Sequence, residues 1–184
     1  MTLRLARRDD ADAIAAIYAP FVTGSAVSFE TEAPDAGEMA ARIAEGGDLY
    51  PWLVAEGADG GIEGFAYACA FRARRAYRFA VETSVYVAES CHGRGVGRRL
   101  YEALLPILEG QGFTQAIAAI TLPNPGSVRL HERLGFSQAG CYRDVGYKLG
   151  EWRSVSLWQR ALAPQTERPE EPRPFAPSFG TYLS

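Results

Sequence analysis

The strongest constraint on the fold of this chain is a glycine-rich turn between a strand-like stretch and a helix-like one. Residues 79–88 (FAVETSVYVA) alternate between apolar and polar side chains, as a half-buried strand does. The chain then reads HGRGVGRR from His92 to Arg99 and continues with leucines at helical spacing. Glycines let the backbone approach a ligand closely, and the free N–H groups at a helix start attract an anion. The turn therefore predicts a pyrophosphate cradle at a strand-to-helix junction.

Two better-known phosphate motifs do not fit this turn. A P-loop would need a Lys followed by Ser or Thr, and a dinucleotide-binding fingerprint would need a third glycine where Arg98 stands. A glycine- and arginine-rich connection that binds no ligand is the alternative interpretation.

The remaining pattern predicts an α+β fold with a mixed sheet. Early strands form antiparallel hairpins, whereas two strand-helix-strand units follow later in the chain. Strands are expected at residues 3–7, 51–57, 62–71, 79–88, 115–122, 136–143 and 153–162, and helices after a cap at Asp9 and Asp10 and over 35–45, 96–109 and 124–134.

Composition narrows the class of protein. The chain has 184 residues, a usual length for one domain, and a net charge of −3, which argues against a general nucleic-acid binder. Three cysteines without a C-x-x-C pair indicate neither a disulfide framework nor a zinc site, so we expect no metal. We expect no membrane partner and a cytoplasmic protein, because no signal peptide or membrane-spanning apolar run is recognisable.

Residues 1–163 are predicted to form a single domain, and 164–184 a proline-rich, flexible tail. The tail is rich in proline and glutamate and cannot bury enough apolar surface to offset its ordering entropy. The end of the tail carries three aromatic residues, Phe175, Phe179 and Tyr182, so docking of this end on the body or on a partner is left open.

A second block of sequence makes the pattern specific. The turn resembles the R/Q-x-x-G-x-G/A motif with which the GNAT superfamily of N-acetyltransferases binds acetyl-CoA. The stretches PWLVAE, FAYACAFRARRAYRFAVETSVYV, LPNPGSVRLHERLGF and VGYKLGEW together resemble the phosphinothricin and methionine sulfone acetyltransferase branch of that superfamily. The resemblance covers residues 3–162 and implies a central mixed, mostly antiparallel sheet of about seven strands with a splayed pair, flanked by about four helices.

The resemblance implies acetyl-CoA as the acetyl donor. The pyrophosphate would bind the turn, and the pantetheine arm would pair with the strand like an added strand. His92 departs from the Gln or Arg of many members, which matters little because the cradle works mainly through backbone. The implied cofactor-binding residues are Val85, Tyr86, Val87, His92, Gly93, Arg94, Gly95, Val96, Gly97, Arg98, Asn124 and Ser127.

Glu82 is the candidate catalytic base. A carboxylate in an apolar strand is costly to bury unless it is hydrogen-bonded or functional. An amine substrate must lose a proton before it attacks a thioester, and the resemblance implies this role for Glu82. The alternative is a salt bridge to Arg74, Arg75 or Arg78.

His131 is the second candidate catalytic residue. It stands where many GNAT members carry a tyrosine that is thought to protonate the departing thiolate. An imidazole can donate a proton near neutral pH or help to remove one from the amine. The alternative is a partly exposed helix histidine without a catalytic role.

An arginine-rich run, FRARRAYR from Phe71 to Arg78, is the candidate acceptor-binding segment. A guanidinium pairs with a carboxylate or phosphinate through two hydrogen bonds. Arg74 and Tyr77 are the predicted substrate contacts, with Phe29 as a weaker third. A solvated hairpin tip is the alternative for most of these arginines.

The first functional hypothesis is an acetyl-CoA-dependent N-acetyltransferase. The resemblance implies direct transfer, in a ternary complex, to the α-amine of a small amino-acid analogue such as phosphinothricin, methionine sulfoximine or methionine sulfone, and a homodimer. The alternatives are acetylation of another amine (a protein N-terminus, a polyamine or an aminoglycoside) and a non-catalytic regulatory module that binds acyl-CoA.

Overall fold

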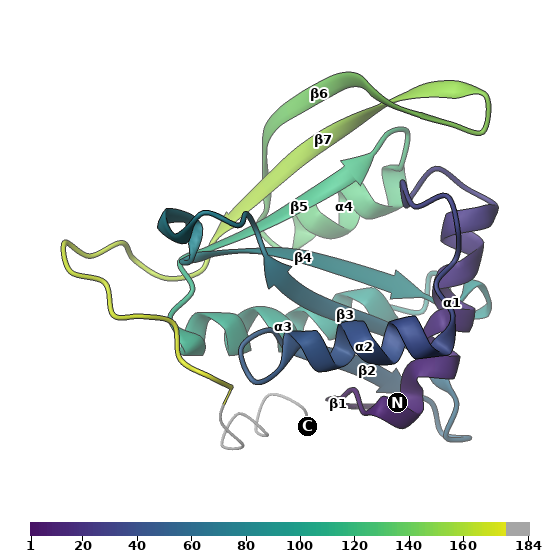
Figure 1. Cartoon of the computed structure of the whole chain (residues 1–184), viewed down its shortest axis with the longest axis horizontal. Helices are drawn as coiled ribbons and strands as arrows, with labels where there is room; N and C mark the ends of the chain where they lie inside the picture. Colours follow the sequence, from purple (N-terminus) through teal and green to yellow (C-terminus); the bar gives the residue numbers. More distant parts are fainter. Residues whose placement is uncertain (176–184) are drawn as a thin grey trace.

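The computed structural model describes residues 1–175, so Phe179 and Tyr182 lie outside the described residues. One mixed sheet has the strand order β1-β2-β3-β4-β5-β7-β6, and helices flank it (Figure 1). This arrangement confirms the predicted α+β class. The strands are β1 (Thr2–Leu5), β2 (Trp52–Glu56), β3 (Ile62–Ala70), β4 (Ala80–Val87), β5 (Gln115–Thr121), β6 (Ser137–Lys148) and β7 (Glu151–Ala161), and the α-helices are α1 (Ala11–Thr23), α2 (Ala36–Gly46), α3 (Val96–Gln111) and α4 (Pro125–Arg133).

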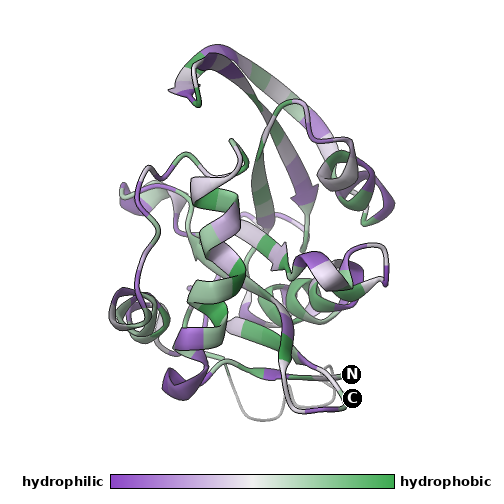
Figure 2. Ribbon diagram, turned by 90° about the vertical axis from the view of Figure 1, so that its right-hand side faces the viewer, coloured by the Kyte–Doolittle hydropathy of each residue, from purple (hydrophilic) through white to green (hydrophobic). Residues whose placement is uncertain are grey.

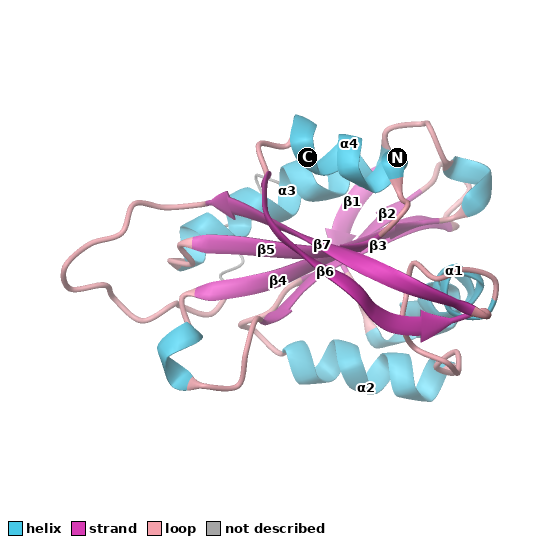
Figure 3. Cartoon of the chain, turned by 90° about the horizontal axis from the view of Figure 1, so that it is seen from above, coloured by secondary structure: helices cyan, strands magenta, loops and turns pink. Residues whose placement is uncertain are grey.

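The helices form a layer on each side of the sheet. Seen from above, α1 and α2 lie on one side of the strands and α3 and α4 on the other (Figure 3). On the α3 side Leu100, Leu104 and Leu108 are fully buried, as their helical spacing predicted. On the other side Trp52 and Phe65 are core residues that cluster with buried side chains of α1 and α2.

The last two strands are longer than predicted. β6 and β7 continue to the turn at Leu149–Gly150, so their hairpin reaches beyond the helical layers (Figure 2). The register shifts between Gln138 and Gly140 and again between Tyr142 and Gly146. Such irregularities interrupt the alternation of apolar and polar residues, so the strand extends beyond the end of that alternation in the sequence.

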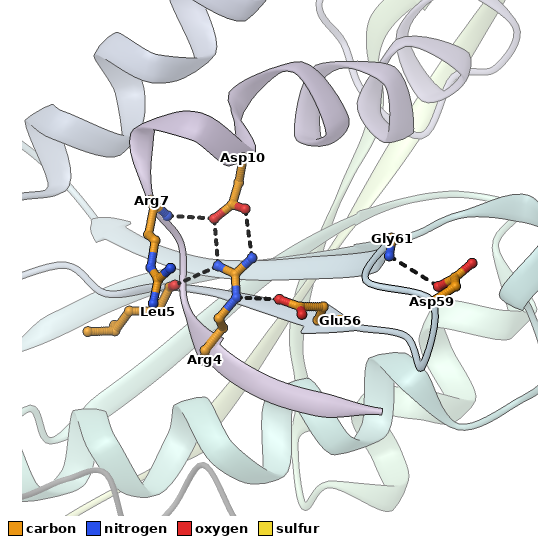
Figure 4. A network of polar contacts seen from close by, with 7 residues as sticks. All are labelled: Arg4, Leu5, Arg7, Asp10, Glu56, Asp59 and Gly61. Carbon is orange, nitrogen blue, oxygen red and sulfur yellow. Dashed lines mark hydrogen bonds and ion pairs between the residues drawn. The ribbon is translucent and has the colours of Figure 1, made fainter.

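The first helix begins differently from the prediction. Asp10 makes no side-chain cap for α1. Its carboxylate accepts hydrogen bonds from the Arg4 guanidinium, at 2.7 and 2.8 Å, and from the Arg7 backbone N–H (Figure 4). Arg4 also pairs with Glu56 of β2 at 2.6 Å. The Asp10 carboxylate, which was predicted to cap the helix, therefore forms an ion pair with Arg4 that the sequence pattern did not indicate.

The first part of the predicted tail contacts the body. The Arg173 N–H donates to the Gln111 carbonyl at 2.7 Å, and the buried Gln111 side chain donates back to the Arg173 carbonyl at 3.0 Å. Glu171 pairs with Arg78 at 2.8 Å and with Arg75 at 3.3 Å. The flexibility of the tail, whose residues 176–184 lie outside the described residues, stays a prediction.

Candidate active site

The two central strands separate just beyond Glu82. β4 and β5 pair in parallel only from Ala80–Gln115 to Glu82–Ile117. Beyond this point β4 stays paired with β3, and β5 stays paired with β7. Their facing edges are therefore free to pair with an extended ligand, which is what strand addition requires. The splayed pair that the resemblance implied is present.

A narrow groove of about 50 Å3 lies between the separated strands. Val85 and Tyr86 of β4 line it from one side, and Asn124 and Ser127 at the start of α4 line it from the other. Residues from two distant sequence motifs therefore meet at one groove, which we call the cofactor groove.

The glycine-rich turn leads into α3 as predicted. Gly93 and Gly95 have φ angles of 74° and 81°, in the region that favours glycine. The N–H groups of the first turn of α3 have no intrahelical partners and can bind an anion. Arg94 pairs with Glu63 at 3.4 Å and Arg98 with Glu102 at 2.7 Å, so backbone is the main anion-binding element. Binding of a pyrophosphate here stays a prediction.

His92 is exposed and holds the turn to β4. Its Nε2 lies 2.9 Å from the Val87 carbonyl. Since a carbonyl can only accept, Nε2 donates this hydrogen bond. His92 therefore fixes the geometry of the turn and leaves the backbone amides to face a ligand.

His131 of α4 reaches the cofactor groove in a defined orientation. The Asn124 Oδ1 caps α4 by accepting from the Ser127 N–H at 3.1 Å. One turn later, His131 Nδ1 lies 2.8 Å from the Ser127 carbonyl. Nδ1 must therefore carry a hydrogen, which leaves Nε2 as an acceptor in the neutral ring.

His131 is buried, unlike the partly exposed histidine of the alternative interpretation. Its ring edge contacts Tyr101 and Phe136. Burial lowers the pKa of His131, so the ring is neutral at pH 7. Of the two proton-transfer roles that the sequence left open, this geometry favours acceptance over donation.

A second cavity, of about 500 Å3, contains Glu82 and Arg72. We call it the acceptor cavity. Glu82 is half-buried, and its burial raises its pKa while the Arg72 guanidinium partly offsets the rise. None of the ion pairs within residues 1–175 involves Glu82. The alternative of a salt bridge to Arg74, Arg75 or Arg78 is therefore wrong, and a carboxylate is available to accept a proton.

The arginine run supplies Arg72 to the acceptor cavity, rather than Arg74. Arg74 and Tyr77, the predicted substrate contacts, do not line this cavity. Tyr77 instead supports Arg72, whose guanidinium carbon lies 5.8 Å from the Tyr77 ring centroid and 5.0 Å from that of Phe71. The sequence does not single out Arg72, because four arginines in one short run carry no signal of which one lines a cavity.

Phe29, the weaker of the predicted substrate contacts, lines the acceptor cavity, and the chain's only lysine holds its loop. The buried Lys148 Nζ donates to the Ser28 and Glu30 carbonyls at 2.6 and 2.7 Å. The Phe29 ring lies against Gly146, where any Cβ would overlap it. The β6–β7 hairpin therefore fixes the loop on both sides of Phe29.

The two cavities adjoin along β4 and β5. Ala119 lines both of them, and the same loop contributes Val27 to the groove and Phe29 to the acceptor cavity. A ligand arm in the groove thus ends beside a pocket that offers a base and a guanidinium. This arrangement can remove a proton from an amine and place that amine against the end of the arm.

Residues 1–175 lack two further features. They contain no cluster of three or more His, Cys, Asp or Glu side chains placed to hold a metal ion. Among these same residues, no helix has the length and apolarity to cross a membrane.

Comparisons with known proteins agree on one family. Residues 3–155 match the family described as acetyltransferase (GNAT) domain. The chain is 42% identical over 175 residues to a phosphinothricin N-acetyltransferase of Streptomyces viridochromogenes, covering 95% of this chain and 93% of the relative. It is 36% identical over 161 residues to an L-methionine sulfoximine/L-methionine sulfone acetyltransferase of Pseudomonas paraeruginosa, covering 87% and 94%. The crystal structure of a GNAT superfamily phosphinothricin acetyltransferase from Sinorhizobium meliloti in complex with AcCoA superimposes with a TM-score of 0.88 at 38% identity, covering 92% and 93%.

Proposed function

Because this chain belongs to the GNAT family of acetyltransferases, we propose that it transfers an acetyl group from acetyl-CoA directly to the α-amine of a small amino-acid analogue. The observation that carries the proposal is that Glu82 and Arg72 line the same cavity, which adjoins the cofactor groove. The names of the relatives support acceptors of the phosphinothricin, methionine sulfoximine and methionine sulfone type.

The residues of the groove would hold and orient acetyl-CoA. Bound acetyl-CoA supplies the acetyl group as an activated thioester. Amides of the turn from Gly93 to Arg98 bind its pyrophosphate, and the free edge of β4 at Val85–Val87 pairs with its extended arm. Amides near Val85 also donate hydrogen bonds to the oxygen on which negative charge develops.

The residues of the acceptor cavity would hold and deprotonate the amine. Arg72 binds the acidic group of the acceptor, because a guanidinium pairs with a carboxylate or phosphinate through parallel hydrogen bonds. Glu82 takes the proton of the ammonium group. Because burial raises its pKa, Glu82 is a better base than an exposed glutamate.

Release of free thiol from acetyl-CoA tests this proposal. We expect rapid release with L-methionine sulfone or phosphinothricin and little release with spermidine or an aminoglycoside, because Arg72 repels a cationic acceptor. If the enzyme instead prefers the cationic amines, the proposed class of amino-acid analogue acceptors is wrong. If acetyl-CoA raises the melting temperature but no amine gives thiol release, the chain is a regulatory binding module. An acetyl-CoA concentration of 100 times Kd adds about 2.7 kcal/mol of stability.

The two histidines give a further prediction. His131→Ala should lower kcat at saturating substrates by about 10- to 100-fold, because it removes a group at the reactive end of the groove. His92→Ala should mainly raise the KM for acetyl-CoA, since it loosens the turn. Steady-state kinetics of both variants check this split, and equal losses of kcat would contradict it.

A homodimer and a cytoplasmic location are proposals of the same kind. The outer part of the β6–β7 hairpin exposes apolar side chains, including Tyr147, Leu149 and Trp152, at 58–63% of their surface. An apolar cluster of this kind supports association of two copies through the hairpin. Light scattering measures the mass in solution, and a monomer at micromolar concentration would refute the dimer.

A further inference from the structure

The last five described residues, Glu171–Phe175, lie against the body, and we call them the tail strap. They run past the C-terminal end of α3 (Figure 1). Gln111 binds the Arg173 backbone there, and the Phe175 N–H donates to the Asp48 carbonyl in the loop between α2 and β2. Phe175 also lines a cavity of about 210 Å3 beside this loop. The tail strap therefore has a fixed course over the body.

The body holds the tail strap through a buried amide, that of Gln111. Gln111 is 1% exposed at the end of α3, whose other buried residues are aliphatic or aromatic. Its Nε2 donates to the Leu49 carbonyl at 2.9 Å and to the Arg173 carbonyl at 3.0 Å. Both hydrogens of this amide are therefore used. Release of the tail strap would leave a buried donor unpaired, which costs free energy, so the docked position is favoured.

At its other end, the tail strap brings one carboxylate to two arginines. Arg75 and Arg78 are three residues apart around the 3₁₀ helix η2 (Arg75–Tyr77), and residues at this spacing share one side of such a helix. Their guanidinium groups repel each other unless an anion lies between them. Glu171 accepts from Arg78 Nε with both carboxylate oxygens, at 2.9 and 2.8 Å, and from Arg75 at 3.3 Å. Within residues 1–175, no other carboxylate forms an ion pair with the arginine-rich run.

The helix η2 also carries the tyrosine that supports Arg72. The Tyr77 ring centroid lies 5.7 Å from that of Phe71, and the Arg72 guanidinium lies over both rings. Two backbone hydrogen bonds, of 2.9 and 3.1 Å, close this short helix. A single 3₁₀ turn is a weak element by itself, because its hydrogen-bond geometry is poor. The ion pairs of Glu171 therefore add to what fixes Tyr77.

We propose that Glu171 is a positioning residue for the acceptor. Its carboxylate holds η2 through two arginines, and η2 holds Tyr77 in place. Tyr77 in turn keeps the Arg72 guanidinium at the acceptor cavity, where it binds the acidic group of the acceptor. This rests on the proposed function, because it needs an anionic acceptor at Arg72. The tail strap thus contributes to acceptor binding although none of its five residues lines the acceptor cavity.

Glu171→Gln tests this, because glutamine keeps the size of the side chain and removes its charge. We expect the KM for methionine sulfone to rise about threefold to fivefold, since exposed ion pairs are individually weak. Because only binding of the acceptor is affected, kcat and the KM for acetyl-CoA should change little. The melting temperature should stay the same, since Gln111 still binds the strap. Glu171→Asp keeps the charge and should restore most of the lost affinity.

The sign of the change separates positioning from charge alone. Loss of a negative charge near the acceptor cavity would by itself attract an anionic acceptor and lower its KM. Glu56→Gln is the matched control, because it also removes one negative charge from an ion pair with an arginine, Arg4, and lines neither the cofactor groove nor the acceptor cavity. This variant should keep the acceptor KM.

Two shortened chains separate the tail strap from the residues that follow it. A chain that ends after Phe175 should keep the acceptor KM of the full chain. A chain that ends after Glu170 should raise it at least as much as Glu171→Gln does. It should also melt at a lower temperature, because the Gln111 amide loses a partner.

Several results would overturn the inference. An unchanged or lower acceptor KM in Glu171→Gln overturns it, and so does an equal rise in Glu56→Gln or in the chain that ends after Phe175. A rise in the KM for acetyl-CoA as large as that for the acceptor overturns it as well, because the effect would then be general. If the unmodified protein releases thiol with methionine sulfone and Glu171→Gln behaves identically, only this inference is wrong. If the unmodified protein releases no thiol with any acidic acceptor, the proposed function is wrong together with it.

Discussion

Glu82→Gln should lower kcat/KM for the acceptor by about 10²- to 10⁴-fold while the protein remains folded. The carboxylate lines the acceptor cavity and has no ion-pair partner within residues 1–175, so the amide removes the base and breaks no salt bridge. Because burial raises the pKa of Glu82, the charged form is disfavoured in the folded protein. A neutral glutamine should therefore leave the melting temperature at pH 7 unchanged or higher.

The pH dependence of kcat distinguishes a base from a merely polar residue. The deprotonated carboxylate is the active form, so kcat should rise with pH through the raised pKa of Glu82. Arg72 lowers that pKa, and Arg72→Gln should therefore move the rising limb to higher pH at saturating acceptor. In Glu82→Gln the limb should disappear. A variant that keeps both the limb and the rate would show that another group removes the proton.

Lys148→Met should lower both stability and acceptor affinity. The lysine donates to two backbone carbonyls of the Phe29 loop, and an unsatisfied buried acceptor costs about 1–3 kcal/mol. We expect a loss of about 3 kcal/mol in the free energy of unfolding, measured by urea titration. Because Phe29 loses its support, the KM for the acceptor should rise about 10-fold, whereas the KM for acetyl-CoA should change little.

Arg4→Met is the control that separates a loss of stability from a loss of acceptor affinity. Arg4 is also a paired cation, bound to Asp10 and Glu56, and it lines neither the cofactor groove nor the acceptor cavity. This variant should be less stable than the unmodified protein but keep its acceptor KM. If Lys148→Met also keeps the acceptor KM, then the lysine is structural only and does not position Phe29.

Most of the fold was predictable because its elements carry local signals. The alternation in residues 79–88 predicted β4, and the leucine spacing after the glycine-rich turn predicted α3. The β6–β7 hairpin was underestimated, because Gly140 and Gly146 interrupt its alternation at the register shifts. Asp10 was predicted to cap a helix because of its position before an apolar run. Its ion pair with Arg4 depends on the tertiary fold and leaves no local signal in the sequence.

Residues of the candidate site were predictable where only one residue of the required type stands at the motif position. Glu82 is a single carboxylate in an apolar strand, and Asn124 is a single cap before a helix. Arg72 could not be separated from its neighbours, because its orientation depends on where β3 ends and on packing against Phe71 and Tyr77.

The separate linings of the cofactor groove and the acceptor cavity have a consequence for how the acceptor specificity of this enzyme can change. The cofactor groove is lined mainly by β4, β5 and α4, whereas the wall of the acceptor cavity comes mainly from Phe29 and the β6–β7 hairpin. Substitutions at Phe29 and in the hairpin can therefore change the acceptor without altering the lining of the cofactor groove. A one-residue insertion or deletion in β4, in contrast, would exchange the faces of Glu82 and Thr83. Natural variation in acceptor choice should accordingly accumulate in the loop and hairpin, while the length of β4 stays fixed.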